Sequence, residues 1–205
     1  MNSNKIKNII FDLGGVLIDW NPEYVYLDVF KGNEKKMHWF FKNICTEKWN
    51  LNQDAGYSLE KATNDLIELY PEYKSYIKVY YGKWEEMLGG EITETVWILN
   101  KLIPQYEVFA LTNWSAETFP VALKKFSFLK SFKDIIVSGE EKLIKPDPKI
   151  FNLAIKRFKI TPNETIFIDD NINNIISAKK MNFITHHFKT PEKLIEYLKI
   201  IGIKI

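Results

Sequence analysis

The first hydrophobic run of the chain ends abruptly at polar and glycine residues. Residues 9–11 are Ile-Ile-Phe, without a helical period, and they are followed by Asp12 and by the pair Gly14-Gly15. A short apolar run closed by a turn signal is typical of a buried strand in a parallel sheet. Asp12 is therefore expected at the carboxyl end of that strand, where open α/β sheets bind ligands. An Asp after a strand also caps helices and forms Asx-turns, so this position alone leaves both interpretations open.

A long helical stretch follows, from about residue 20 to residue 88. Asn21-Pro22 supplies a helix cap followed by proline, no convincing strand appears before about residue 90, and the clearest helix begins at Ser58. Most of the many aromatic side chains here are expected to form the core of a small helical bundle. Trp20 is the exception, because it lies just past the turn that follows the first strand. We interpret residues 20–88 as a helical insertion.

From residue 93 onward, helical and extended patterns alternate. The predicted order is helix 93–103, strand 106–112, a helix ending near 126, strand 135–137, a helix from 147, strand 165–168, a helix from 171, strand 183–185 and a terminal helix. The buried faces expected for the last three helices are Phe151, Ala154, Ile155 and Phe158; Ile172, Ile175 and Ile176; and Leu194, Ile195, Leu198 and Ile201.

Strands that alternate with single helices imply right-handed crossovers and a parallel sheet covered on both faces. The predicted fold class is therefore α/β, with a doubly wound, Rossmann-like parallel sheet. Residues 1–19 and 89–205 are expected to form this core, and residues 20–88 an inserted helical cap.

Composition and charge narrow the range of functions. Hydrophobic residues make up 46% of the 205 residues and charged residues 26%, which is ordinary for a globular protein. The formal net charge is +2, so nothing indicates binding to nucleic acid or membrane. The single cysteine, Cys45, excludes an internal disulfide and fits a reducing compartment. With no signal-peptide pattern before Ile9 and no apolar run near the roughly 20 residues of a membrane span, we expect a cytoplasmic protein. We also expect it to be a monomer or weak dimer.

Several chemically suggestive side chains fall on one edge of the predicted sheet. They are Asp12, Thr112, Asn113, Lys145, Asp169 and Asp170. Two adjacent carboxylates at a strand end are costly unless a cation neutralises them, and with Asp12 they make three hard oxygen ligands of the kind Mg²⁺ prefers. Thr112 and Asn113 can donate hydrogen bonds and Lys145 supplies a positive charge, a combination that binds a phosphoryl group and stabilises its in-line transfer. Asp12 can then act as nucleophile and form an aspartyl-phosphate.

Four segments, in order, resemble the motifs of the haloacid dehalogenase-like hydrolase superfamily. They are Asp12-Leu13-Gly14-Gly15-Val16-Leu17, Leu111-Thr112-Asn113, Lys145-Pro146-Asp147-Pro148-Lys149-Ile150-Phe151 and Phe167-Ile168-Asp169-Asp170-Asn171. The resemblance spans nearly the whole chain, and the helical insertion stands where members of that superfamily carry a C1 cap. It implies a nucleophilic Asp12, a phosphate-binding Thr112 and a catalytic Lys145. The magnesium ligands that it implies are Asp12, Asp169, Asp170 and the main-chain carbonyl of Gly14.

One position departs from the pattern of the superfamily. Its phosphatases usually carry a second aspartate two residues after the nucleophile, which protonates the leaving group and later activates water, whereas this chain has Gly14. Glycine cannot transfer a proton, so a contribution of roughly 10²- to 10⁴-fold has to come from elsewhere or be missing. Some members with this glycine resemble sugar-1-phosphate phosphatases and are still hydrolases, so the glycine does not by itself imply inactivity. Asp19 or a residue of the insertion is a candidate substitute, unless Asp19 only turns the chain into the insertion.

Three functions compete on this evidence. The predicted one is a Mg²⁺-dependent phosphatase that acts on a small phosphorylated metabolite such as a sugar phosphate. The second is a 2-haloacid dehalogenase, which alkylates the same aspartate; it needs no metal and lacks paired carboxylates, so Asp169-Asp170 argues against it. The third is a catalytically weakened member that binds a phosphorylated ligand or a partner protein, and Gly14 motivates this alternative.

Overall fold

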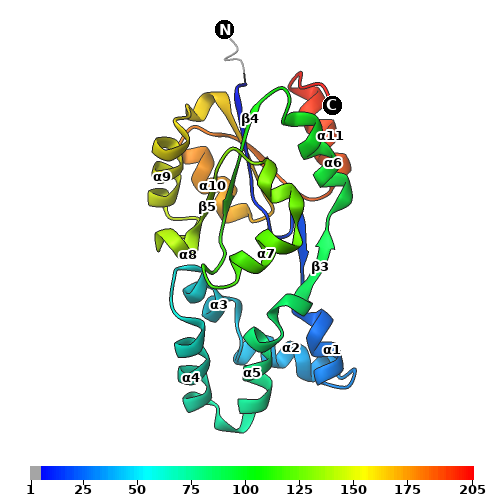
Figure 1. The fold of residues 1–205 in the computed structure, drawn as a ribbon, viewed down its shortest axis with the longest axis vertical. Helices are drawn as coiled ribbons and strands as arrows, with labels where there is room; N and C mark the ends of the chain where they lie inside the picture. The colour runs from blue at the N-terminus through cyan, green and yellow to red at the C-terminus, as the bar shows by residue number, and fades with distance from the viewer. Residues whose placement is uncertain (1–5) are drawn as a thin grey trace.

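The computed structural model describes residues 6–205, and its centre is a five-stranded parallel sheet (Figure 1). The strands lie in the order β5-β4-β1-β6-β7. Their bounds are Asn8–Phe11 (β1), Glu107–Thr112 (β4), Ile135–Val137 (β5), Thr165–Asp169 (β6) and Ile184–His187 (β7). Because β1 pairs with both β4 and β6, the first strand of the chain is the central one. The predicted α/β class with a doubly wound parallel sheet is confirmed.

Alternate residues of the strands pack on opposite faces of the sheet. The helices that cover it are α6 (Thr93–Leu102), α9 (Pro148–Phe158), α10 (Ile172–Lys180) and α11 (Pro191–Ile200). Ile9 and Phe11 share a core with residues of α6 and α11, whereas Ile10 lies in a second core with residues of α9 and α10. All three strand residues are fully buried. The uninterrupted apolar run at 9–11 follows from this coverage of both faces.

The buried face of α10 differs from the prediction. Ile175 is buried, but Ile172 and Ile176 are 48% and 46% exposed. The buried positions are Asn174, Ile175 and Ala178, because the helix is rotated so that the Asn174 amide reaches the carboxylate of Asp169 at the end of β6. The predicted faces of α9 and α11 are buried except for the half-buried Ile155, Ile195 and Ile201.

The chain between residues 23 and 87 is helical. It forms α1 (Glu23–Val29), α2 (Glu34–Asn43), α3 (Glu47–Asp54), α4 (Leu59–Leu69) and α5 (Lys74–Gly82), with short 3₁₀ turns at Pro71–Tyr73 and Trp84–Met87. Ser58 caps α4 by accepting a hydrogen bond from the Lys61 N–H. Aromatic rings fill the centre of this segment: Tyr26 lies 5.4 Å from Phe40, measured between ring centroids.

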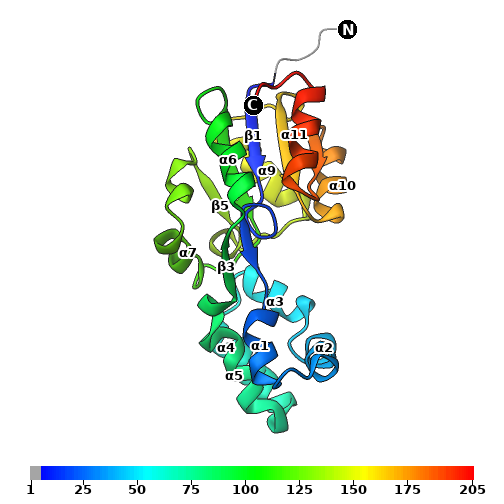
Figure 2. The same ribbon diagram turned by 90° about the vertical axis from the view of Figure 1, so that its right-hand side faces the viewer.

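A two-stranded antiparallel ribbon, which the sequence analysis did not predict, joins the helical segment to the sheet. β2 (Ile18–Trp20) pairs with β3 (Leu88–Glu91), and α1–α5 lie below this ribbon in both ribbon views (Figures 1 and 2). These strands have only three and four residues, and β3 contains Gly89-Gly90, so the alternation of hydrophobic and polar residues is too short to identify them from the sequence. A Cβ at position 89 would overlap the carboxylate of Asp19 and the ring of Tyr24, so a larger residue there would force these side chains to move.

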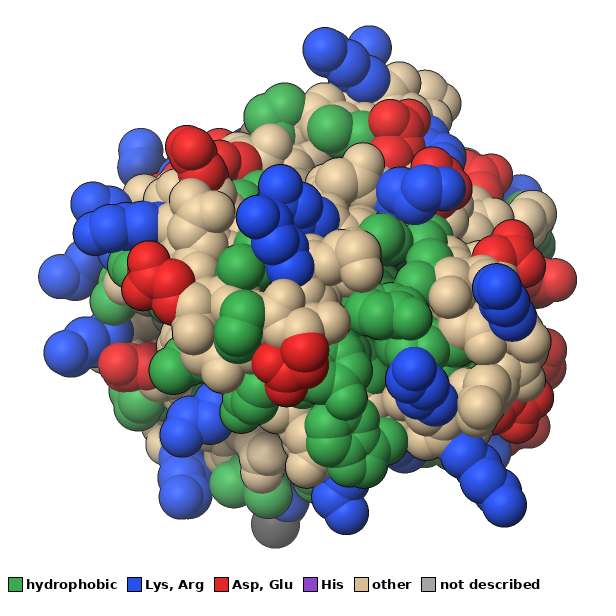
Figure 3. Space-filling model, turned by 90° about the horizontal axis from the view of Figure 1, so that it is seen from below, with side chains coloured by type: hydrophobic (Ala, Val, Ile, Leu, Met, Phe, Trp, Pro, Cys, Tyr) green, Lys and Arg blue, Asp and Glu red, His purple; other side chains and the backbone are tan. Residues whose placement is uncertain are grey.

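The helical segment also touches the loops of the sheet directly. The Trp84 and Trp114 rings meet edge to face with centroids 5.5 Å apart, and the Leu59 N–H donates to Glu117 Oε1 at 2.9 Å. On the outer surface of the segment, charged side chains of both signs are scattered among hydrophobic ones (Figure 3). Within residues 6–205, no helix combines the length and apolar character needed to cross a bilayer.

Candidate active site

The carboxyl ends of three neighbouring strands bring predicted site residues together. Asp12 directly follows β1, Thr112 ends β4 and Asp169 ends β6. The Asp12 N–H donates to the main-chain carbonyl of Ile168 at 2.8 Å, so the sheet still holds the backbone at the predicted nucleophile. All three side chains are buried. Because β1 lies between the other two strands, the sheet itself sets the spacing of these groups.

The turn after β1 depends on its second glycine rather than its first. Gly15 has φ = +70°, and a Cβ there would lie 2.5 Å from Asp170 Oδ2. Gly14 is not among the glycines with positive φ, and an added Cβ would meet no atom within 4 Å. The turn therefore requires Gly15 for close approach to Asp170, whereas the conformation of Gly14 is open to other residues.

Lys145 lies at the centre of the site and is 1% exposed. Its Nζ is 2.7 Å from Asp169 Oδ2 and 2.9 Å from Asp12 Oδ2. Asn113 clamps the lysine backbone, because its Oδ1 accepts from the Lys145 N–H at 2.8 Å and its Nδ2 donates to the Lys145 carbonyl at 2.9 Å. Asn113 was predicted to offer a phosphate donor from either its side chain or its backbone. Its side chain is used to position Lys145, which leaves the main-chain N–H as the candidate donor.

Negative charge is in excess in this cluster. Burial raises the pKa of Asp12 to about 7 against the attraction of Lys145, and repulsion from Asp169 and Asp170 adds to the rise. Burial and the neighbouring Asp169 also raise the pKa of Asp170. Although burial opposes the charged form of Lys145, the carboxylates of Asp12 and Asp169 raise its pKa, so the lysine stays cationic. Three carboxyl groups facing one ammonium group call for a further positive charge.

The three carboxylates fit a hard divalent cation. One oxygen each from Asp12, Asp169 and Asp170 can be chosen so that all lie within 4.8 Å of one another. Asp169 is the most heavily engaged of the three, because its oxygens accept from Lys145, from the Asn171 N–H and twice from the Asn174 amide. A carboxylate has about four acceptor positions, so a metal bond to Asp169 would displace one of these donors.

The sequence analysis missed two neighbours of this cluster. Asn174 lies in the first turn of α10 and binds both oxygens of Asp169, at 3.0 and 3.1 Å. His187 ends β7 and its Nε2 donates to the main-chain carbonyl of Asp170 at 2.8 Å. Asn174 lies five residues after Asp169, in the first turn of the next helix. This short separation was the only feature of the sequence that could have placed Asn174 near the cluster.

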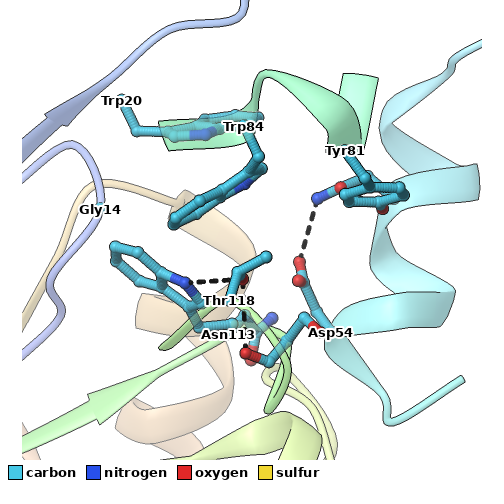
Figure 4. Close-up of a pocket in the computed structure, with 10 residues that line it drawn as sticks. Gly14, Trp20, Asp54, Tyr81, Trp84, Asn113 and Thr118 are labelled. Atoms are coloured by element: carbon cyan, nitrogen blue, oxygen red, sulfur yellow. Dashed lines mark hydrogen bonds between the residues drawn. The ribbon is translucent and has the colours of Figure 1, made fainter. Parts of the chain in front are cut away.

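A cavity beside Gly14 opens between the sheet and the helical segment (Figure 4). Its volume is about 90 Å³, well above what one water molecule needs. On one side it is lined by residues of the loops that follow β1 and β4, namely Gly14, Asn113, Trp114 and Thr118. On the other side its lining includes Trp20, Asp54 and Trp84. Trp20, singled out from the sequence, therefore does reach the site. Its buried Nε1 has no hydrogen-bond partner within residues 6–205.

The chain resembles a family of hydrolases, two phosphatases and the solved structure of an enzyme. Residues 9–186 match the family described as haloacid dehalogenase-like hydrolase. The chain is 27% identical over 193 residues to D-ribitol-5-phosphate phosphatase of Bacteroides thetaiotaomicron, covering 88% of this chain and 90% of that protein. It is 25% identical over 182 residues to the sesquiterpene phosphatase astK of Aspergillus oryzae, covering 88% and 89%. The structure of a Bacteroides thetaiotaomicron enzyme, bt-2542, in complex with magnesium and inorganic phosphate superposes with a TM-score of 0.66 at 26% identity, covering 90% of this chain and 94% of the other.

Proposed function

The chain belongs to the haloacid dehalogenase-like hydrolase family, and on that premise we propose that it is a Mg²⁺-dependent phosphatase acting on a small phosphorylated metabolite. The observation that carries this proposal is the buried cluster in which Lys145 bridges Asp12 and Asp169 beside Asp170. Phosphoryl transfer needs a nucleophile, a fixed positive charge and hydrogen-bond donors at one point. The relative named as a D-ribitol-5-phosphate phosphatase favours the phosphate of a sugar or sugar alcohol as the substrate class.

Asp12 is the proposed nucleophile. The Leu13 N–H donates to its Oδ1 at 2.7 Å and Lys145 Nζ lies 2.9 Å from its Oδ2, so the carboxylate is held in one orientation. It attacks phosphorus while the ester P–O bond breaks, which gives an aspartyl-phosphate that water then hydrolyses. The Thr112 hydroxyl and the Asn113 main-chain N–H are the proposed donors to the phosphoryl oxygens, and Lys145 opposes their charge.

Asp12, Asp169, Asp170 and the main-chain carbonyl of Gly14 are the residues that we propose hold Mg²⁺. When bound, the ion supplies the positive charge that offsets the carboxylates and the phosphoryl oxygens. The excess negative charge of the cluster and the spacing of its carboxylates support this assignment. The magnesium and phosphate complex of bt-2542 supports it as well.

We further propose that residues 20–88 act as a C1-type cap over a core formed by residues 1–19 and 89–205, of which 1–5 lie outside the described residues. Support comes from the β2–β3 ribbon, which carries the chain into and out of the helical segment, and from the contact of Trp84 with Trp114 above the site. A cap in this position would exclude water during phosphoryl transfer. The cytoplasmic location and the monomer or weak-dimer state stay predictions.

One specific observation favours a second candidate function. Gly14 lacks the side chain with which most phosphatases of the superfamily transfer a proton, which favours a weakened member that binds a phosphorylated ligand. The paired carboxylates Asp169-Asp170 argue against the third alternative, a metal-independent 2-haloacid dehalogenase.

A screen of phosphate esters with and without Mg²⁺ tests the proposal, with Asp12→Asn as the key variant. The substitution keeps the shape of the side chain and removes the attacking charge, so turnover should vanish while the protein stays folded. Mass spectrometry of acid-quenched protein should detect the aspartyl-phosphate in the parent and not in Asp12→Asn. Residual turnover within about tenfold of the parent would rule out this nucleophile.

A further inference from the structure

We propose that Asp54, at the end of α3, donates the proton to the departing oxygen, the task that a side chain at position 14 performs in most phosphatases of the superfamily. The inference rests on the proposed phosphatase function. It assigns a catalytic role to a residue of the helical segment that lies in none of the four motifs.

Asp54 and Gly14 are on opposite sides of one cavity (Figure 4). Both residues line this cavity of about 90 Å³, so we expect a leaving group that fills it to contact both of them. The position of Asp54 is fixed relative to the sheet, because Ser138 Oγ donates to its main-chain carbonyl at 2.6 Å. Ser138 directly follows β5, so α3 is tied to the same sheet edge as the nucleophile.

The surroundings of the Asp54 carboxyl suit proton transfer. Asn50 Nδ2 donates to its Oδ2 at 3.2 Å, and the Tyr81 hydroxyl orients that amide by donating to Asn50 Oδ1 at 2.9 Å. No ion pair with Asp54 occurs within residues 6–205. Burial raises the pKa of Asp54 to about 7, although the nearby main-chain N–H of Ser115 opposes the rise. Both protonation states are therefore populated near neutral pH, as a group that first gives and then takes a proton requires.

Other carboxyl groups nearby are engaged elsewhere. Asp19, a candidate from the sequence, accepts from the Tyr24 hydroxyl at 2.6 Å and does not line the cavity. Glu117 accepts from the Leu59 N–H at the start of α4. Asp54 is the one carboxyl group among the residues that line the cavity.

Asp54 acts twice in the proposed reaction, first as an acid and then as a base. As Asp12 forms its bond to phosphorus and the ester P–O bond breaks, the protonated Asp54 carboxyl transfers its proton to the leaving oxygen, directly or through one water, and an alcohol departs. The resulting Asp54 carboxylate then takes a proton from the water that attacks phosphorus and breaks the bond to Asp12. Inorganic phosphate leaves, and Asp12 and Asp54 return to their starting states.

The test compares leaving groups, because an aryl oxide departs without a proton and an alkoxide does not. We would measure kcat/KM for alkyl phosphates and for p-nitrophenyl phosphate, with saturating Mg²⁺, in the parent, in Asp54→Asn and in Asp54→Glu. Asp28→Asn is the matched control, since it removes an exposed carboxylate from the same helical segment. In Asp54→Asn, the alkyl esters should lose roughly 10²-fold or more relative to the aryl ester, and Asp54→Glu should recover part of this loss.

Equal losses for all leaving groups in Asp54→Asn, or no loss, would overturn the role of Asp54 and leave the phosphatase function standing. A parent that hydrolyses no phosphate ester would instead overturn the proposed function itself. Thermal unfolding of each variant checks the fold. Were Asp54→Asn unfolded, Asp54→Ala would serve for the same comparison. A selective loss of alkyl esters in Asp19→Asn, with none in the Asp54 variants, would also refute the assignment.

Discussion

Replacing Gly14 by aspartate tests whether the cavity beside Asp12, the proposed nucleophile, receives the leaving group. The position can accept a side chain, because its φ is not positive and a Cβ there meets nothing within 4 Å. Gly14 also lines the cavity that Asp54 faces. A carboxyl group added at position 14 should therefore share the leaving oxygen with Asp54.

The substitution has a cost in stability that Mg²⁺ should reduce. It adds a fourth carboxylate next to the cluster of Asp12, Asp169 and Asp170. At an effective dielectric constant of about 20, two unit charges ~5 Å apart repel by about 3 kcal/mol. Replacing a glycine at a compatible position recovers about 0.4–1 kcal/mol through the unfolded chain. We expect a lower unfolding temperature than the parent in chelator, and a smaller difference as Mg²⁺ is added.

The rate effect should depend on Asp54. With Asp54 present, a second donor adds little, so Gly14→Asp alone should raise kcat/KM for alkyl phosphates by less than about tenfold. In the Asp54→Asn background, the same change should restore roughly 10²-fold or more, because it replaces the missing donor. Aryl phosphates should respond weakly in both backgrounds.

The assay is a double-mutant cycle on the slope of log kcat/KM against leaving-group pKa, for the parent, the two single variants and the double variant. The parent and the double variant should have shallow slopes and Asp54→Asn a steep one. An equal gain from Gly14→Asp in both backgrounds would show that the two side chains act independently. No gain in either background would show that position 14 does not face the leaving oxygen.

Three further predictions concern the metal site, the turn and pH. Mg²⁺ should raise the unfolding temperature of the parent, and chelation should abolish its activity. Asp170→Ala should remove the effect of Mg²⁺ on the unfolding temperature. A parent whose unfolding temperature does not respond to Mg²⁺ and whose activity survives chelation would favour the dehalogenase alternative. Gly15→Ala should inactivate the protein, since φ is +70° and the added Cβ would lie 2.5 Å from Asp170 Oδ2. The control is Gly32→Ala, where φ is +75° and the space is open, so it should only lower the free energy of unfolding by about 1 kcal/mol. Equal activity of the two variants would contradict this prediction. The pKa of Asp12 is about 7 in the folded protein, whereas its ordinary value, expected in the unfolded chain, is 3.8. The folded state therefore binds this proton more tightly than the unfolded state does. This contribution to stability is present at low pH and is lost as pH rises from about 4 to about 7, and urea unfolding in chelator should show a smaller decline for Asp12→Asn.

The parts of the molecule that the sequence predicted are those with local signals. Asp12 and Asp169 end apolar runs, and Asp147-Pro148 caps a helix, so each of these positions could be located from its immediate neighbours. The β2–β3 ribbon could not be located in this way, because its strands are short and form only by pairing with a segment far along the chain, as Asp19 does with Gly90. The rotation of α10 also depends on a contact, that of Asn174 with Asp169.

The proposed role of Asp54 could not be predicted from the sequence for a similar reason. It ends an amphipathically weak, polar helix, Glu47–Asp54, and lies in no motif. Its environment is created by residues from α5, from the loop after β4 and from the strand end at Ser138. Only the folded chain brings these groups around the carboxyl and leaves Asp54 half-buried at the wall of the cavity.

The pairing of Asp19 with Gly90 has a consequence for how such a protein can change over evolution. In an antiparallel pair, directly opposed Cα atoms are about 4.5–5.5 Å apart, so the segment between these two residues leaves and re-enters the sheet domain at almost one point. A segment with its ends so close can be exchanged, lengthened or shortened without moving any strand of the sheet. Selection can therefore alter the helical walls of the cavity through this one segment, while the residues that we propose for phosphoryl transfer are inherited intact.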